Sequence, residues 1–262
     1  MLSRYVNIIK YHGFLRGIRR VKDQVVEVDL YDWVNRIDTR TILGIDELNS
    51  TLGGKSAATA MHYQPTLTES VLKPLRHLAA NFSIVGASSA CFLDLGCGRG
   101  KALHVAKFKA LQHATMVGID LHPALLEDAV RNLKVAEDCI ERDEEGVVSV
   151  DAPKVKLRRC NVMDVDYASL LAPYDVVIVF NKNSFDREVT EETLREITSA
   201  CRDKALFYIY NNPVFDAVFE DGFEVVFSMS GWHKNWNTKV FRKREVKKAR
   251  AATETAVSGR IY

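Results

Sequence analysis

Short apolar runs alternate with longer amphipathic stretches over most of the chain. Five apolar runs have the length and composition of buried strands, and they cover residues 90–95, 114–119, 155–160, 174–180 and 205–210. Apolar residues at helical spacing predict helices over residues 67–81, 102–111, 124–140, 188–201 and 214–219. Strands that alternate with helices form a parallel sheet that is covered by helices on both faces.

The end of this pattern differs from the rest. Two apolar runs, 223–229 and 238–242, follow each other without a long helix between them and predict an antiparallel pair. The chain is therefore predicted to fold as an α/β protein with a seven-stranded, mostly parallel sheet and an antiparallel last strand. We expect a small N-terminal helical cap over residues 1–60, a main domain over 61–245 and a polar C-terminal tail over 246–262.

The N-terminal segment is basic. Residues 1–22 contain no acid, and their apolar residues recur near helical spacing, although Gly13 weakens the middle of the pattern. Three interpretations stay open: a helix that docks on the main domain, a helix that lies on anionic lipid, and a cleaved transit peptide. The small and polar residues 49–60 indicate a mobile connection, after which Thr66 and Glu69 are predicted to form a capping box.

A glycine-rich turn follows the first predicted strand. Its pattern is D-x-G-x-G-x-G, formed by Asp94, Gly96, Gly98 and Gly100, and a helix is predicted directly after it. Glycines let the turn adopt positive φ and let a ligand lie against bare backbone. A carboxylate inside the turn would repel a pyrophosphate, whereas S-adenosylmethionine carries an ammonium and a sulfonium and no phosphate. The alternative is a glycine turn that binds nothing.

A second acidic residue follows the glycine turn at the distance that is typical of a ribose-binding acid. Asp120 ends the second predicted strand, about 20 positions after Gly100, where an acidic residue holds the ribose hydroxyls of a bound nucleotide. Leu121 follows it and is expected to contact the cofactor. The two features together predict a nucleoside cofactor with a positively charged tail.

The turn and the alternating pattern resemble the class I (Rossmann-like) S-adenosylmethionine-dependent methyltransferases over roughly residues 62–244. The details are similar to a bacterial group related to the non-SET histone lysine methyltransferases. Four segments carry that likeness, at 36–48, 63–66 (Tyr-Gln-Pro-Thr), 94–100 and 210–213 (Tyr-Asn-Asn-Pro). The resemblance implies that Tyr63 and Thr66 lie over the cofactor.

The third strand end departs from the family pattern. Class I enzymes usually have Gly-Asp-Ala there, and the acid accepts from the adenine amino group, whereas this chain has Cys160-Asn161-Val162. Asn161 is expected to accept through its amide oxygen, with the Val162 N–H facing the ring. Asp164 is the rival acceptor.

The acceptor side is expected at the carboxyl ends of the later strands, where open α/β sheets bind ligands. Asn181, Tyr210 and Asn211 stand there, and His233 is the candidate general base if an acceptor hydroxyl must lose a proton. The alternative for His233 is a loop histidine packed beside Trp232 and Trp236. The group often has Asn-Pro-Phe after the fourth strand, and its absence here leaves the class of acceptor open.

These features predict a transferase that moves a methyl group from S-adenosyl-L-methionine by in-line displacement. The acceptor is expected to be a carbohydrate or small-molecule hydroxyl or a protein lysine. Nucleic acid is disfavoured because the net charge is only +2. The alternatives are a domain that binds this cofactor or a related nucleoside without catalysis, and a dinucleotide-dependent oxidoreductase.

Composition changes this picture little. Apolar and charged contents of 47% and 27% are ordinary for a globular protein, and no apolar run approaches the length of a membrane span. The five cysteines are scattered and lack C-x-x-C spacing, so neither a disulfide framework nor a zinc or other metal site is predicted. We expect a cytoplasmic protein, with a membrane surface (through residues 1–22) or a mitochondrion as the alternatives.

Overall fold

The computed structural model describes residues 2–41, 43–44, 63–84, 89–134, 140–141 and 154–245, with side chains from residue 5 onward and without those of residues 140–141. The predicted mobile connection at 49–60 and the polar tail at 246–262 lie outside the described residues, and the proposed division into domains stays a prediction.

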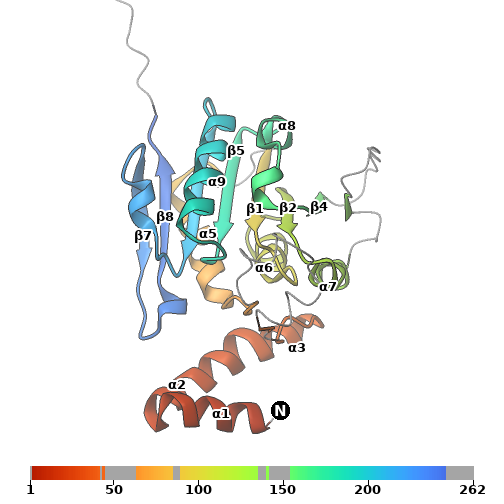
Figure 1. Ribbon diagram of the computed structural model, residues 1–262, viewed down its shortest axis with the longest axis vertical. Helices are drawn as coiled ribbons and strands as arrows, with labels where there is room; N and C mark the ends of the chain where they lie inside the picture. The colour runs from red at the N-terminus through yellow and green to blue at the C-terminus, as the bar shows by residue number, and fades with distance from the viewer. Residues whose placement is uncertain are drawn as a thin grey trace, which may run out of the picture.

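The centre of the fold is one sheet whose described strands follow the order β3-β4-β2-β1-β5-β6-β8-β7 (Figure 1). Their bounds are β1 Ala90–Leu95, β2 Thr115–Asp120, β3 Ile140–Glu141, β4 Val155–Arg159, β5 Val176–Asn181, β6 Ala205–Asn211, β7 Phe223–Met229 and β8 Thr238–Lys243. The seven predicted strands are confirmed to within two residues at each end. The two-residue β3, which was not predicted, pairs with β4 at the edge of the sheet.

The pairing of the strands is parallel from β3 to β6, and β8 runs antiparallel to both of its neighbours. The predicted antiparallel last strand is therefore confirmed. The chain crosses from β1 to β2 and β4 on one side and then returns to place β5 on the other side of β1. The edge between β1 and β5 is thus the topological switch point, where ligands bind in open α/β sheets.

Helices cover both faces of the sheet, as predicted. The core on one face contains apolar residues of α5 (Thr68–Asn81), α6 (Lys101–Lys109) and α7 (Pro123–Leu133). The core on the other face contains residues of α8 (Tyr167–Leu171) and α9 (Arg187–Ala200). Alternate residues of β1 divide between the two, since Phe92 belongs to the first core and Leu93 to the second.

Several boundaries differ from the expected ones for local reasons. The helix predicted over 124–140 ends at Leu133 because Lys134 takes a left-handed conformation with φ 53°. The helix predicted over 214–219 is a single 3-10 turn, η5, at Asp216–Phe219. The helix α8 and the short turns η4 (Val162–Asp164) and η6 (Lys234–Trp236) were not predicted, because each is too short to show a period.

The N-terminal segment is helical throughout its first part, with α1 (Leu2–His12), α2 (Phe14–Asp23), the π-helical segment η1 (Gln24–Leu30) and α3 (Tyr31–Asn35). Gly13, with φ 76°, separates α1 from α2. Figure 1 shows these helices below the sheet, on the side to which the arrowheads of β1 and β5 point. They therefore lie across the carboxyl ends of the parallel strands.

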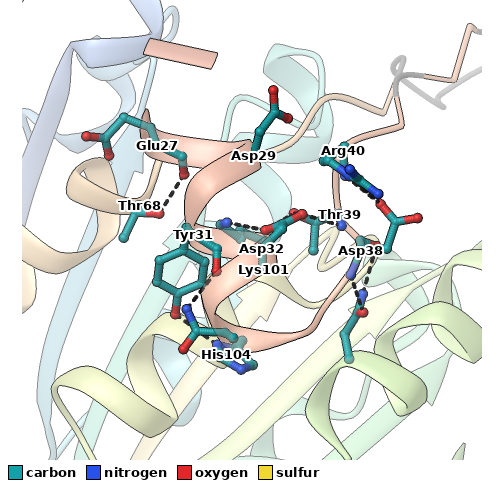
Figure 2. A network of polar contacts seen from close by, with 12 residues as sticks. Glu27, Asp29, Tyr31, Asp32, Asp38, Thr39, Arg40, Thr68, Lys101 and His104 are labelled. Atoms are coloured by element: carbon teal, nitrogen blue, oxygen red, sulfur yellow. Dashed lines mark hydrogen bonds and ion pairs between the residues drawn. The ribbon is translucent and has the colours of Figure 1, made fainter. Parts of the chain in front are cut away.

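A buried ion pair fastens this segment to the main domain (Figure 2). Lys101 begins α6, directly after the glycine turn, and its Nζ lies 2.6 Å from Oδ1 of Asp32 in α3. The side chains are 3% and 1% exposed, and Asp32 also accepts from the backbone N–H and the hydroxyl of Thr39. Tyr31 supports the pair, because Lys101 Nζ lies 3.8 Å from the centre of its ring.

The predicted capping box is wrong. Helix α5 begins at Thr68 with Leu67 at its N-cap, and neither Thr66 nor Glu69 caps it with a side chain. Instead, Glu27 of η1 accepts from the Glu69 N–H at 2.9 Å through Oε2, and its carbonyl accepts from the Thr68 hydroxyl at 2.7 Å. A carboxylate from the N-terminal segment thus satisfies the positive end of α5.

Breaking the Asp32–Lys101 pair from one side leaves a buried charge without its partner. We expect Lys101→Met and Asp32→Asn each to lower the free energy of unfolding by about 3–5 kcal/mol, and the double variant to lose less than the sum. Chemical denaturation of the four proteins measures this coupling. The exposed pair Arg187–Glu191 is the control, since Arg187→Gln should change stability by no more than about 0.5 kcal/mol. Additive losses at Asp32 and Lys101 would contradict the assignment.

Candidate functional site

A cavity of about 570 Å³ lies at the switch point, between the carboxyl ends of the strands and the N-terminal helices. The glycine turn and the ends of β2 and β5 form its walls, and Tyr11, His12 and Arg20 of α1 and α2 line it from the opposite side. The chain segments that the sequence predicted to hold a cofactor therefore meet at one place.

The glycine turn presents its backbone to this cavity. Gly98 has φ 51°, and a Cβ at this position would lie 2.3 Å from Cε2 of Tyr63, so the Tyr63 ring rests against bare backbone. A Cβ on Gly96 would lie 3.0 Å from Ser184. The positive φ that was predicted for the turn is present at Gly96, Gly98 and Gly100. Gly100 lies against Ala129 of α7, and of these three glycines Gly96 alone lines the cavity.

Asp94 is the most unusual group of the site. It is 3% exposed and lines the cavity, and within the described part of the chain its carboxylate has no hydrogen-bond or ion-pair partner. Burial raises the pKa of Asp94 well above its usual range, and the nearby charge of Asp120 raises it further. A buried carboxylate without a counterion costs stability unless a positive ligand compensates it.

Asp120 closes the same end of the cavity. Its Oδ2 accepts from the Gly98 N–H at 2.7 Å and its Oδ1 accepts from the His122 N–H at 2.9 Å. Burial raises the pKa of Asp120, while these backbone hydrogen bonds oppose the rise. Each carboxylate oxygen keeps a second lone pair, so both can still accept from a pair of ribose hydroxyls.

Asn161 and Val162 also line the cavity, beyond the end of β4. The Asn161 Oδ1 caps η4 by accepting from the Met163 N–H at 3.1 Å, and an amide oxygen can accept a second hydrogen bond. Asp164 is exposed and does not belong to the residues that line the cavity. The geometry therefore favours Asn161 over its rival. Tyr63, Thr66 and Leu121 line the cavity as well.

Three of the four residues predicted as catalytic lie outside the lining of this cavity. Asn181, Tyr210 and Asn211 are fully buried, and their side chains hold loops. Asn181 accepts from the Ser184 N–H at 2.9 Å, and the Tyr210 hydroxyl donates to Asn183 Oδ1 at 3.2 Å. Asn211 Nδ2 lies 3.0 Å from the Asn235 carbonyl oxygen. These residues position the loops 182–185 and 233–237, whose own side chains reach the cavity.

His233 does line the cavity, but its hydrogen bond disfavours the expected role of a base. Its Nδ1 accepts from the Asn235 backbone N–H at 3.2 Å, so the proton of the neutral ring lies on Nε2. Burial and the positive charges of Arg20, His12, Lys234 and Lys182 together lower the pKa of His233 to about 4. At neutral pH the ring is therefore a hydrogen-bond donor.

Several residues of the cavity were missed. The most important is Lys182, whose Nζ donates to the carbonyls of Gln64 and Pro65 at 2.9 and 2.8 Å. Ser184 and Phe185 follow it in the same loop, and Arg20 comes from α2. A signal for Lys182 was available, because it follows Asn181 at the end of a strand and occupies the place of the proline that the resembled group has.

The described residues include no group of three or more His, Cys, Asp or Glu side chains arranged to hold a metal ion. Within the same part of the chain, no helix is long and apolar enough to span a membrane. Cys97 and Cys160 line the cavity, and neither forms a disulfide within the described residues.

Comparisons with known proteins give likenesses of structure. No family model matches the chain, and no curated protein matches it. The mitomycin 7-O-methyltransferase MmcR is similar with 16% identity over 66% of this chain, at a TM-score of 0.43, and the likeness covers 54% of MmcR, about half its length. An S-adenosylmethionine-dependent methyltransferase from Leishmania major is similar with 13% identity over 67% of this chain and 72% of its own, at a TM-score of 0.45. A TehB-like methyltransferase from Corynebacterium glutamicum has 18% identity over 68% of this chain and 98% of its own, at a TM-score of 0.38.

The class I methyltransferase fold that the resemblance implied is confirmed, and the strand order with the reversed β8 shows it directly. The narrower likeness to the bacterial group related to the non-SET lysine methyltransferases stays a prediction.

The residues present fit S-adenosylmethionine on two observations of the structure. A buried carboxylate without a partner among the described residues awaits a cation, and Asp120, which lines the same cavity, keeps lone pairs for a pair of ribose hydroxyls. A pyrophosphate fits less well, because it would lie against Asp94 in the turn.

We expect Asp94→Asn to stabilise the empty protein. The pKa of Asp94 is higher in the folded than in the unfolded chain, so ionisation of this group lowers stability as the pH rises above its ordinary value. Thermal unfolding at neutral pH should show a gain on the order of 1 kcal/mol, or roughly 2–4 °C in Tm, that shrinks toward pH ~4. Asp164→Asn, at an exposed carboxylate, is the control and should change little. A destabilised Asp94→Asn protein would contradict the burial of an unpaired charge.

Proposed function

We propose that this protein is an S-adenosyl-L-methionine-dependent methyltransferase. The observation that carries the proposal is the buried carboxylate of Asp94, which faces the cavity beside the glycine turn and has no partner among the described residues. A ligand with a positively charged tail and a nucleoside end satisfies Asp94 and Asp120 together.

In this proposal each wall of the cavity holds one part of the cofactor. Asp94 and the backbone of the turn at Gly96 bind the ammonium end, and Gly98 and Gly100 shape the turn behind them. Asp120 and Leu121 bind the ribose, and Asn161 and Val162 bind the adenine. When bound, S-adenosylmethionine supplies a methyl group on a positively charged sulfur.

The chain's own residues would align the acceptor and exclude water. Tyr63 and Thr66 cover the turn, and Tyr11, His12 and Arg20 close the cavity from the N-terminal helices. Alignment and desolvation supply much of the rate of such a transfer, and a dedicated base is not required. His233 donates through Nε2, so we assign it to binding rather than to proton removal. A carbohydrate or small-molecule hydroxyl and a protein lysine remain the proposed acceptor classes.

Binding of S-adenosylhomocysteine and of NAD separates this function from that of an oxidoreductase. We expect S-adenosylhomocysteine to bind and NAD to bind at least ~100-fold more weakly, because its pyrophosphate would lie against Asp94 in the turn. Asp120→Ala should weaken S-adenosylhomocysteine binding by about 1.5–3 kcal/mol, the magnitude of a charge-assisted hydrogen bond. Calorimetry measures the affinities for the two ligands and the loss of affinity in Asp120→Ala. Preference for NAD, or unchanged affinity in a folded Asp120→Ala protein, would overturn the assignment.

The adenine contact has a test of its own. Asn161→Asp keeps an oxygen that both caps η4 and accepts from the adenine amino group, so affinity for S-adenosylhomocysteine should stay within about threefold. Asn161→Leu loses the acceptor and should bind roughly tenfold more weakly or worse. Because the cap is lost as well, Asp166→Ala, which uncaps the neighbouring helix α8 outside the cavity, is the matched control. Equal affinity of the two Asn161 variants would mean that backbone alone reads the adenine.

Transfer itself requires an assay with radiolabelled methyl donor and candidate acceptors. Release of S-adenosylhomocysteine that depends on an acceptor distinguishes an enzyme from a domain that binds the cofactor without catalysis.

A further inference from the structure

Basic side chains gather in the same cavity, away from the carboxylates that hold the cofactor in the proposed function. They come from three segments that lie far apart in sequence: Arg20 of α2, Lys182 of the loop after β5, and His233 with Lys234 at the start of η6. His12 of α1 joins them, because its ring centre lies 6.2 Å from that of His233. The cluster therefore arises from the tertiary fold, since no single helix or loop contains all of its members.

Lys182 is held in place with one N–H to spare. Its ammonium group has three donors, and two of them are used on the carbonyl oxygens of Gln64 and Pro65. Asn181 fixes the loop from behind by accepting from the Ser184 N–H. Lys182 and His233 both line the cavity. The remaining N–H of Lys182 and the Nε2–H of His233 are therefore two donors on the cavity wall.

The electrostatic effects show that these groups lie close to one another. Burial lowers the pKa of Lys182 to about 7, and the positive charge of Arg20 contributes. Four cationic or basic side chains lower the pKa of His233 in addition to burial. Asp23 of α2 is an acid on this side, and its Oδ2 accepts from Trp236 Nε1 at 2.7 Å. Lys101 also lines the cavity, but Asp32 balances its charge.

The cofactor does not neutralise this cluster. S-adenosylmethionine carries two positive charges against one carboxylate, and the cavity offers it Asp94 and Asp120. Arg20, Lys182 and Lys234 then leave an excess of positive charge with the cofactor bound, even if a carboxylate balances Arg20. Desolvated positive charges of this kind are favourable when an anion binds between them.

We propose that the methyl acceptor carries an anionic group, a phosphate or a carboxylate, which binds Lys182 and His233 with Arg20 and Lys234 beside them. This inference rests on the proposed methyl transfer and names the chemical class of its acceptor. An acceptor of this class is a small molecule or a modified sugar with a negative charge near the hydroxyl or amine that is methylated.

Anion binding to the complex with S-adenosylhomocysteine tests the proposal. Inorganic phosphate and acetate are titrated separately at constant ionic strength, with sodium chloride as the reference, and the thermal stability of the complex is measured. We expect one of them to stabilise the complex, and the stronger of the two identifies the anion. The apparent dissociation constant for acetate, whose own charge is constant in this range, should rise as the pH rises through about 7, because the anion binds the protonated form of Lys182.

Variants of Lys182 separate this role from a structural one. Lys182→Gln should weaken the anion response roughly tenfold or more and change the affinity for S-adenosylhomocysteine by less than about threefold. Lys182→Arg, which keeps the charge, should retain the response even if the loop shifts. Lys109→Gln, at an exposed lysine of α6 outside the cavity, is the matched control and should behave as wild type.

The results of these experiments distinguish failure of the anionic acceptor from failure of the proposed methyltransferase function. If S-adenosylhomocysteine binds and Lys182→Gln responds to phosphate and acetate as wild type does, the anionic acceptor is wrong while the methyltransferase stands. If Lys182→Gln loses affinity for S-adenosylhomocysteine itself, Lys182 binds the carboxylate of the cofactor, and the inference is also overturned. If wild type binds no S-adenosylhomocysteine, the proposed function fails first.

Discussion

The ion pair between Asp32 and Lys101 is the contact on which the site depends. It joins the N-terminal segment to the first residue after the glycine turn, and both charges are buried. A buried pair is favourable only with good geometry and further hydrogen bonds, and Thr39 and the Tyr31 ring supply them here. Together with the Glu27 contacts to α5 and the Asp23–Trp236 hydrogen bond, the pair holds the helices that close the cavity against the main domain.

Asp94, which precedes Lys101 in the chain, is buried without a partner in the described part of the protein, in contrast to the paired Asp32. Its burial is similar to that of Asp32, yet no lysine, arginine or backbone N–H among the described residues meets it. A fold selected for stability alone would pair or replace such a group. The cost is understandable if a ligand supplies the missing charge, since binding sites commonly hold groups that are unfavourable in the empty protein.

Much of the fold and half of the site follow from local patterns in the sequence. The strands, the glycine turn and Asp120 are short-range features, and each lies where the pattern placed it. The candidate catalytic residues were predicted only from their positions at the carboxyl ends of strands. Side chains alternate along a strand, so Asn181 points into the core while Lys182 reaches the cavity. Sequence could not reveal the Glu27 cap or the Asp32–Lys101 pair either, because their partners lie 42 and 69 positions apart. The cluster of basic side chains in the cavity escaped prediction for the same reason, as its members come from distant segments.

The central claim is that Asp94 is kept buried and unpaired in order to bind a cation of the cofactor. A bound ammonium would return the raised pKa of Asp94 toward its ordinary range, so binding should release protons. Calorimetry of S-adenosylhomocysteine binding near pH ~6, in two buffers of different ionisation enthalpy, counts them. We expect a net release from the wild-type protein and a clearly smaller release from Asp94→Asn. Binding without proton release, or the same release from both proteins, would contradict the account.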